Sequence, residues 1–148
     1  MDIDSGRVDR YRKKLGFLQQ NITRLREWMG RSSLKIIKEK EDIQSLYGIF
    51  HAAQNAIESI IDIIAMVCKD LINLAEDRLS NIENIIRKNV IPQDLKSGII
   101  ELTGLRNRLV HEYNGIIDEF AWSAIWENIH TMNEFHKEIT AWLNQMIN

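Results

Sequence analysis

Apolar side chains recur at intervals of three and four residues along most of the chain, the spacing of one face of an α-helix. Gly30, Pro92 and the Asn114-Gly115 pair mark where this pattern stops or restarts. No stretch alternates with the period of two that a half-buried β-strand shows, so the sequence predicts an all-α fold. The predicted helices cover residues 8–29, 43–74, 79–88, 92–111 and 118–146.

The helix predicted over residues 43–74 carries the widest apolar surface, because the positions beside its stripe, such as Ile61 and Ala65, are apolar too. A single neighbouring helix cannot cover such a surface. This helix therefore lies at the centre of a bundle or offers a second apolar face to another subunit. We expect a single domain over residues 1–148, an antiparallel helical bundle of four to five helices, and a symmetric homodimer.

Composition and charge narrow the function classes. The 148 residues carry a formal net charge of −2, so any contact with nucleic acid must use a local patch rather than a general positive charge. The longest apolar stretch, residues 60–68, contains Asp62 and is far shorter than the roughly 20 residues of a membrane span. Because Cys68 has no partner for a disulfide and its neighbours are apolar, we expect a buried thiol in a cytoplasmic protein.

Polar side chains with distinct chemistry crowd into residues 106–113, which read RNRLVHEY. Cleavage of RNA without a metal needs a group that takes the proton of the 2′-hydroxyl and a cation that holds the phosphate. His111 suits the first role because the pKa of histidine lies near neutrality. Arg106 suits the second because its planar guanidinium pairs with phosphate oxygens and stays charged. We expect no metal or other cofactor.

The spacing of these two residues raises a geometric question. In an ideal helix, residues five apart are separated by about 140° around the axis and about 7.5 Å along it, so Arg106 and His111 do not share a face. Either the helix loosens at His111, or a second copy of the chain completes the site across a two-fold axis.

Three charged residues nearby are candidates for supporting roles. Glu58 and Asp62 lie four apart, hence on one face, among apolar residues. They form a carboxylate pair or, as we favour, orient Arg106 or His111, because carboxylates on an apolar face need partners. Arg108 either contacts the RNA backbone or is solvated. Among the remaining groups, Glu127, His130 and Glu134 lie on an otherwise solvated face and do not indicate a metal site.

Residues 104–113 (GLRNRLVHEY) resemble the HEPN superfamily, whose signature combines an arginine, a polar residue and a histidine, here Arg106, Asn107 and His111. The sequence from His111 to Tyr113 resembles the HepT branch. Residues 52–63 (AAQNAIESIIDI) are similar to the preceding helix of that branch. The resemblance covers roughly residues 40–140 and departs at His51, where a basic residue such as arginine is expected.

The resemblance implies an endoribonuclease toxin that acts on RNA, such as tRNA or mRNA, as a dimer with its two motifs at the interface. Asn107 would orient Arg106 or His111. The partner would be a nucleotidyltransferase antitoxin of the MntA type that attaches AMP to Tyr113, and the added anion would compete for Arg106. The alternative is a non-catalytic subunit that presents a nucleotide or substrate to a nucleotidyltransferase. That alternative predicts binding without cleavage.

Overall fold

The computed structural model describes residues 3–111 and 119–147, without the side chains of Val110 and His111. Helices make up most of these residues, and this part of the chain contains no strand, so the predicted all-α fold is confirmed. In chain order the helices are α1 (Ser5–Gly30), α2 (Leu34–Glu39), α3 (Ile43–Ile72), α4 (Arg78–Arg87), the 3₁₀ helix η1 (Gln93–Leu95), α5 (Lys96–Gly104), α6 (Arg106–His111), α7 (Glu119–Glu127) and α8 (Ile129–Ile147).

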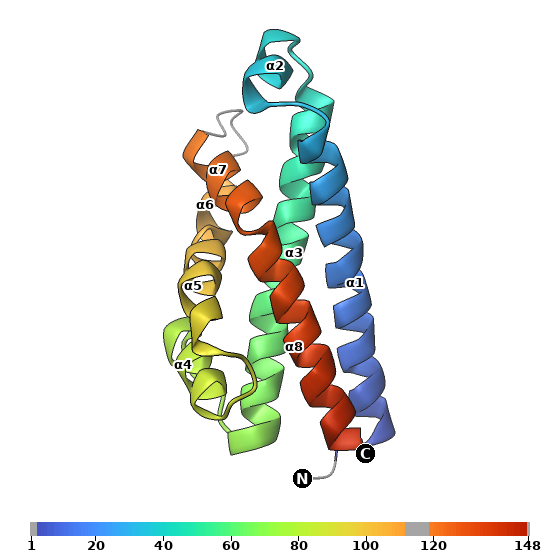
Figure 1. The fold of residues 1–148 in the computed structure, drawn as a ribbon, viewed down its shortest axis with the longest axis vertical. Helices are drawn as coiled ribbons and strands as arrows, with labels where there is room; N and C mark the ends of the chain where they lie inside the picture. The colour runs from blue at the N-terminus through green and yellow to red at the C-terminus, as the bar shows by residue number, and fades with distance from the viewer. Residues whose placement is uncertain (1–2, 112–118, 148) are drawn as a thin grey trace.

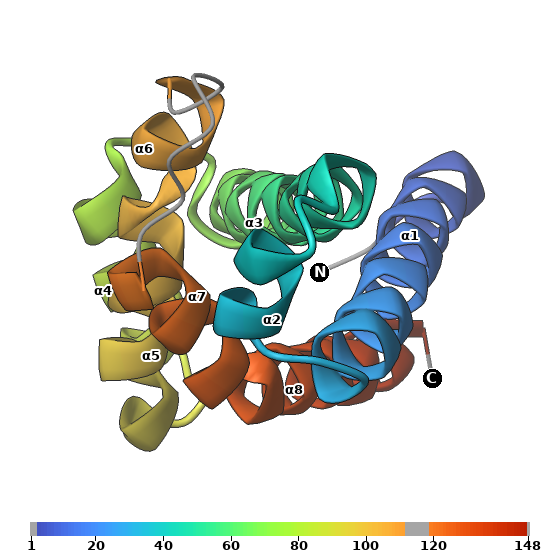
Figure 2. The same cartoon turned by 90° about the horizontal axis from the view of Figure 1, so that it is seen from above.

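The long helices α1, α3 and α8 run along the length of the molecule, with successive segments running up and down in the manner of an antiparallel bundle (Figure 1). The shorter helices α4, α5 and α6 form a column on the side of α3 opposite to α1 (Figure 1). Seen from above, α3 lies between α1 and α6, and α8 covers the other side of the bundle (Figure 2). Contacts of α3 with α1, α4, α5, α6 and α8 make it the central helix, the first of the two alternatives that its sequence allowed.

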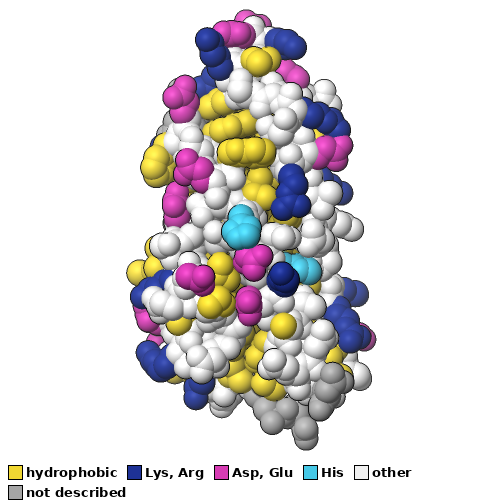
Figure 3. Space-filling view, in the orientation of Figure 1, with side chains coloured by type: hydrophobic (Ala, Val, Ile, Leu, Met, Phe, Trp, Pro, Cys, Tyr) yellow, Lys and Arg dark blue, Asp and Glu magenta, His cyan; other side chains and the backbone are white. Residues whose placement is uncertain are grey.

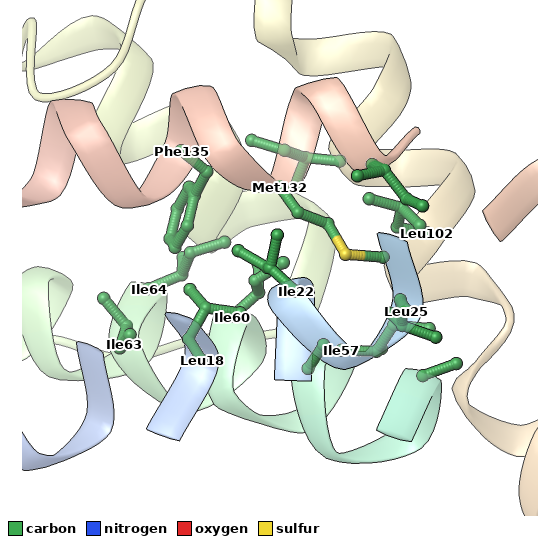
Figure 4. Packing of buried hydrophobic residues seen from close by; sticks show 14 of the residues in the cluster. Leu18, Ile22, Leu25, Ile57, Ile60, Ile63, Ile64, Leu102, Met132 and Phe135 are labelled. Carbon is green, nitrogen blue, oxygen red and sulfur yellow. The ribbon is translucent and has the colours of Figure 1, made fainter. Parts of the chain in front are cut away.

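The core fills the space between α1, α3, α5 and α8 (Figure 4). Its side chains are apolar residues at the helical spacing that the sequence shows, which is why three long helices can pack along their whole length. All of the following are almost fully buried: Leu18, Ile22 and Leu25 on α1, Ile57, Ile60 and Ile64 on α3, Leu102 on α5, and Met132 and Phe135 on α8.

Aspartate caps set the starts of several helices. The side chain of Asp4 accepts a hydrogen bond from the Arg7 amide at 2.8 Å, and Asp77 accepts one from the Ser80 amide at 2.9 Å. Asp42 does the same for α3. Each carboxylate satisfies an amide that has no partner within the helix. At its other end α3 stops at Asn73, whose φ of 57° is the left-handed conformation typical of a helix C-terminus.

The structure departs from the apolar pattern at three places. The segment predicted as one helix over residues 92–111 is interrupted at Leu105, whose amide bonds the carbonyl of Leu102, three residues back, at 3.1 Å. The last predicted helix is interrupted at Asn128, whose side-chain amide donates to the Ala124 carbonyl at 2.8 Å and so competes with the backbone amide for that acceptor. The apolar pattern does not predict the six-residue helix α2, because so short a helix shows no periodic pattern.

The α8 face of the bundle shows a column of hydrophobic side chains in its upper half (Figure 3). Beneath α2, the end of α1 and the start of α3 enclose a hollow of about 570 Å³ that Trp28, Ile36 and Gly48 help to line. Within the described residues, no helix is long and apolar enough to cross a membrane.

Candidate functional site

The arginine of the motif stands at a break in the helical column. α5 ends at Gly104, and α6 begins at Arg106 directly after the interruption at Leu105. Leu105 and Leu109 are buried and hold this segment in the core, whereas Arg106 and Asn107 are exposed. Because Leu105 and Leu109 are buried, the polar side of α6 faces solvent.

Arg106 lies next to a carboxylate of the central helix. Its Nε atom is 3.7 Å from Oε1 of Glu58 on α3, and the two side chains are 49% and 39% exposed. This separation is that of an ion pair rather than a hydrogen bond. The structure thus brings together two of the residues that the sequence singled out, and the charge of Glu58 holds the guanidinium over α3.

Asp62, one helical turn further along α3, has a different partner. Its Oδ2 atom is 3.1 Å from Nζ of Lys14 on α1. In the described part of the chain Asp62 makes no ion pair with Arg106, so the expected orienting contact with that arginine is found for Glu58 alone. Each carboxylate on this face of α3 is therefore neutralised by a cation from a flanking helix.

The other arginine of the motif contacts α7. Cζ of Arg108 lies 5.4 Å from the centre of the Phe120 ring, within the range of a cation–π interaction. The sequence left two alternatives for Arg108, RNA backbone or solvent, and the structure adds an aromatic partner. This contact joins the segments on the two sides of residues 112–118.

The backbone of α6 is helical through His111. Arg106 and His111 therefore keep the helical offset of about 140° around the axis. The side chain of His111 and the whole of Tyr113 lie outside the described residues. His51, where the resemblance to the HEPN superfamily leads us to expect a basic residue such as arginine, is exposed on α3, two turns before Glu58.

A hollow of about 270 Å³ adjoins the Arg106–Glu58 pair, between α1 and α3. Glu58 and Asp62 line it from α3, and Lys14 lines it from α1. The other lining residues are Lys13, Phe17, Asn55 and Ser59. The residues of α1 that line this hollow cannot be recognised from the sequence, because a lysine or phenylalanine beside an apolar stripe carries no signal until the packing of α1 on α3 is known.

Glu127, His130 and Glu134 do not indicate a metal site in the sequence, because they lie on an otherwise solvated face. Among the side chains that the structure describes, which do not include that of His111, no cluster of three or more His, Cys, Asp or Glu residues is arranged to hold a metal ion.

Comparison with solved structures places the fold among HEPN toxins. The tri-AMPylated Shewanella oneidensis HEPN toxin in complex with MNT antitoxin matches with a TM-score of 0.73 at 20% identity, over 88% of this chain and 96% of that chain. A mutant MntA-HpeT toxin–antitoxin matches with a TM-score of 0.75, also at 20% identity, over 90% of this chain and 98% of that chain. At this level of identity the likeness defines the fold alone.

Sequence comparison gives the family. The family described as "Ribonuclease HepT-like" matches residues 18–139. A relative from Archaeoglobus fulgidus, named "Putative RNase", is 32% identical over 121 residues, which are 82% of this chain and 83% of the relative. A relative of similar name from Methanocaldococcus jannaschii is 30% identical over 70 residues, 47% of this chain and 80% of its own. The chain belongs to the HepT-like ribonuclease family.

Proposed function

We propose that this protein is a metal-independent endoribonuclease of a toxin–antitoxin pair, with Arg106 and His111 as its catalytic residues. The observation that carries the proposal is the exposed Arg106 guanidinium, held beside Glu58 at the start of α6 in a chain of the HepT-like ribonuclease family. Negative charge grows on the phosphate during the reaction. A cation stabilises this charge best when it is already in position before the substrate binds.

The proposed reaction uses the nucleophile that RNA itself supplies. The 2′-oxygen attacks the adjacent phosphorus, His111 takes the 2′-hydroxyl proton, and the bond from phosphorus to the 5′-oxygen breaks. The leaving 5′-oxygen takes up a proton, which gives a 2′,3′-cyclic phosphate and a 5′-hydroxyl. Arg106 binds the non-bridging oxygens as their charge grows, and Asn107 orients one of the two catalytic groups.

We further propose that the site is completed in a symmetric homodimer. Because α6 is helical through His111, the guanidinium and the imidazole of one chain start from different sides of the helix. A two-fold axis beside α6 would place Arg106 of one protomer near His111 of its partner. This arrangement is the second of the two alternatives that the spacing in the sequence allows.

The antitoxin that we propose is a nucleotidyltransferase of the MntA type, and Tyr113 is its AMP acceptor. Two observations support this: the two structural neighbours are toxin–antitoxin proteins, and one of them is AMPylated. AMP on Tyr113, two residues from His111, would bring a phosphate to the position of the substrate phosphate and compete for Arg106.

Cleavage of single-stranded RNA and tRNA in excess EDTA tests the proposed reaction. We expect cleavage with cyclic-phosphate ends, and a loss of about a hundredfold or more in Arg106→Ala and His111→Ala. Arg12→Ala, which removes an exposed arginine of α1, is the matched control. Cleavage that stops with the chelator or survives His111→Ala would contradict this mechanism. Binding to a nucleotidyltransferase without cleavage of any RNA would favour the non-catalytic alternative.

The proposed modification has its own test. The chain is produced together with a nucleotidyltransferase of the MntA type, and its intact mass is compared with that of Tyr113→Phe. We expect the mass of one or more AMP groups on the wild type and a loss of activity in the modified protein. An equal mass gain in Tyr113→Phe would place the modification elsewhere.

A further inference from the structure

The hollow between α1 and α3 combines the groups that a single-stranded nucleic acid needs. Lys13 and Lys14 supply ammonium groups on its α1 side, and Phe17, 43% exposed, supplies an aromatic surface one turn further along. Asn55 lines the α3 side with an amide that can donate and accept hydrogen bonds. Proteins bind single strands by this pairing of cations, which follow the backbone, with aromatic rings, on which bases stack.

The hollow adjoins the ion pair between Arg106 and Glu58. Glu58 lines the hollow and also forms the ion pair with Arg106, so Arg106 stands at its rim. The pairs Arg106–Glu58 and Lys14–Asp62 lie one helical turn apart on α3, about 5–6 Å. An RNA strand held at Arg106 would therefore pass over this hollow as it crosses α3 toward α1.

The charges of the hollow are compatible with a phosphate in spite of its two carboxylates. Asp62 is neutralised by Lys14, and Glu58 is neutralised by Arg106. Lys13, which forms no ion pair within the described residues, adds a further positive charge. A phosphate that displaces Asp62 would take over the ammonium group of Lys14.

We infer that this hollow is a binding subsite for a nucleotide adjacent to the scissile phosphate, with its phosphate on Lys13 and Lys14 and its base stacked on Phe17. The inference rests on the proposed function, because it assumes that the strand is held at Arg106. It adds α1, which lies outside the motif, to the substrate-binding surface.

Binding of a fully 2′-O-methylated single-stranded RNA, which lacks the nucleophile and cannot be cleaved, tests the subsite. Fluorescence anisotropy over a range of salt concentrations should show weaker binding for Lys13→Ala and Lys14→Ala, with the salt slope reduced by about 0.7 for each lysine. Asp62→Asn should bind more tightly than the wild type, because it removes a negative charge and frees Lys14. If the lysines had a merely structural role, RNA affinity would not fall in the lysine variants and rise in Asp62→Asn. Arg12→Ala is the control outside the hollow.

The aromatic part of the subsite is tested with two variants of Phe17. Phe17→Leu keeps an apolar side chain but loses the ring, and we expect an affinity loss of about fivefold or more. Phe17→Trp keeps a ring and should bind as well as the wild type or better. Equal losses in both variants would show that stacking is not the source of binding.

The outcomes separate this inference from the proposed function. If the wild type cleaves RNA while the lysine variants bind the methylated RNA as tightly as it does, the subsite is wrong and the proposed function stands. If the lysine variants change only the oligomeric state, measured by light scattering, the hollow is a subunit interface and the subsite is also wrong. If the wild type cleaves no RNA, the proposed function fails, and the binding of methylated RNA still decides the subsite.

Discussion

The carboxylate of Glu58 on α3 and the guanidinium of Arg106 at the start of α6 form an ion pair across two helices, with Oε1 and Nε 3.7 Å apart. Both side chains are more than a third exposed, and ion pairs of this kind contribute only about 0–1 kcal/mol to stability. The pair therefore matters little for folding. Its consequence is that Arg106 has a preferred position before any substrate binds.

Substitution of Glu58 by glutamine should separate the effect of this residue on the position of Arg106 from its effect on stability. We expect kcat for RNA cleavage to fall by about tenfold, because an arginine without its partner samples more orientations. The melting temperature should stay within the error of the measurement. Glu101→Gln, at an exposed glutamate of α5, is the matched control for the loss of a negative charge. Unchanged or faster cleavage in Glu58→Gln would show that Glu58 does not position Arg106.

Much of the helical architecture could be predicted because α1, α3 and α8 bury one continuous stripe each. The interruptions at Leu105 and Asn128 could not be predicted, because the apolar spacing continues across both. At Asn128 the departure comes from a side chain that bonds the carbonyl of Ala124, a local competition that the apolar pattern does not record. Periodicity reports which residues face the core and not whether the backbone between them stays regular.

In the candidate site, Arg106 and Glu58 could be predicted from the sequence, and the structure places them together. The sequence also favours Asp62 as a residue that orients Arg106 or His111; the structure pairs Asp62 with Lys14 and not with Arg106, and the side chain of His111 lies outside the described residues. The periodicity of α3 puts Glu58 and Asp62 on one face but does not say which neighbouring helix each one meets. That depends on the rotation of α1 and α6 about their own axes, which only the packed structure gives.

The N-terminal end of α1 is joined to α3 by a partly buried polar contact at the edge of the core. Tyr11 is fully buried and donates a hydrogen bond from its hydroxyl to Oδ2 of Asp70 at 2.5 Å, and Nε of Arg7 donates to the same oxygen at 2.9 Å. We expect Tyr11→Phe to lower the free energy of unfolding by about 1.5–3 kcal/mol, the range for a hydrogen bond to a charged group. Urea denaturation measures this change.

The same tyrosine makes stability depend on alkaline pH. Burial, with the hydrogen bond to Asp70 and its negative charge, raises the pKa of Tyr11 well above its ordinary value of 10.0. A group whose pKa is raised by folding stabilises the protein fully below its unfolded pKa, and this contribution is lost as the pH rises above that value. The stability difference between wild type and Tyr11→Phe should therefore shrink above about pH 10. A difference that stays constant to pH 11 would contradict this assignment.

Cys68 should be unreactive in the folded protein. Its thiol is buried, donates to the Asn81 carbonyl at 3.4 Å, and has a pKa raised to about 11, mainly by burial and further by the charge of Glu76. At pH 8 only roughly one thiol in a thousand would be a thiolate. We expect alkylation by iodoacetamide to be negligible in buffer and to rise with the unfolded fraction in urea. Rapid alkylation of the native protein would show that the α3–α4 contact opens readily.

Two glycines of α5 offer a matched comparison of packing. A Cβ atom on Gly98 would lie 2.6 Å from Oγ1 and 2.8 Å from Cγ2 of Thr131, and 2.8 Å from Oδ1 of Asn128, whereas a Cβ atom on Gly104 meets nothing within 4 Å. Alanine is favoured over glycine in a helix by about 1 kcal/mol, so Gly104→Ala should raise stability or leave it unchanged. In Gly98→Ala the same gain is opposed by overpacking, which costs about 1–3 kcal/mol, and by disturbance of the Asn128 amide that donates to Ala124. Because Thr131 is branched at Cβ, rotation of its side chain cannot clear the space. We therefore expect a lower melting temperature for Gly98→Ala than for Gly104→Ala in thermal denaturation. Equal melting temperatures would mean that α5 and α8 are packed less closely than their glycine contact indicates.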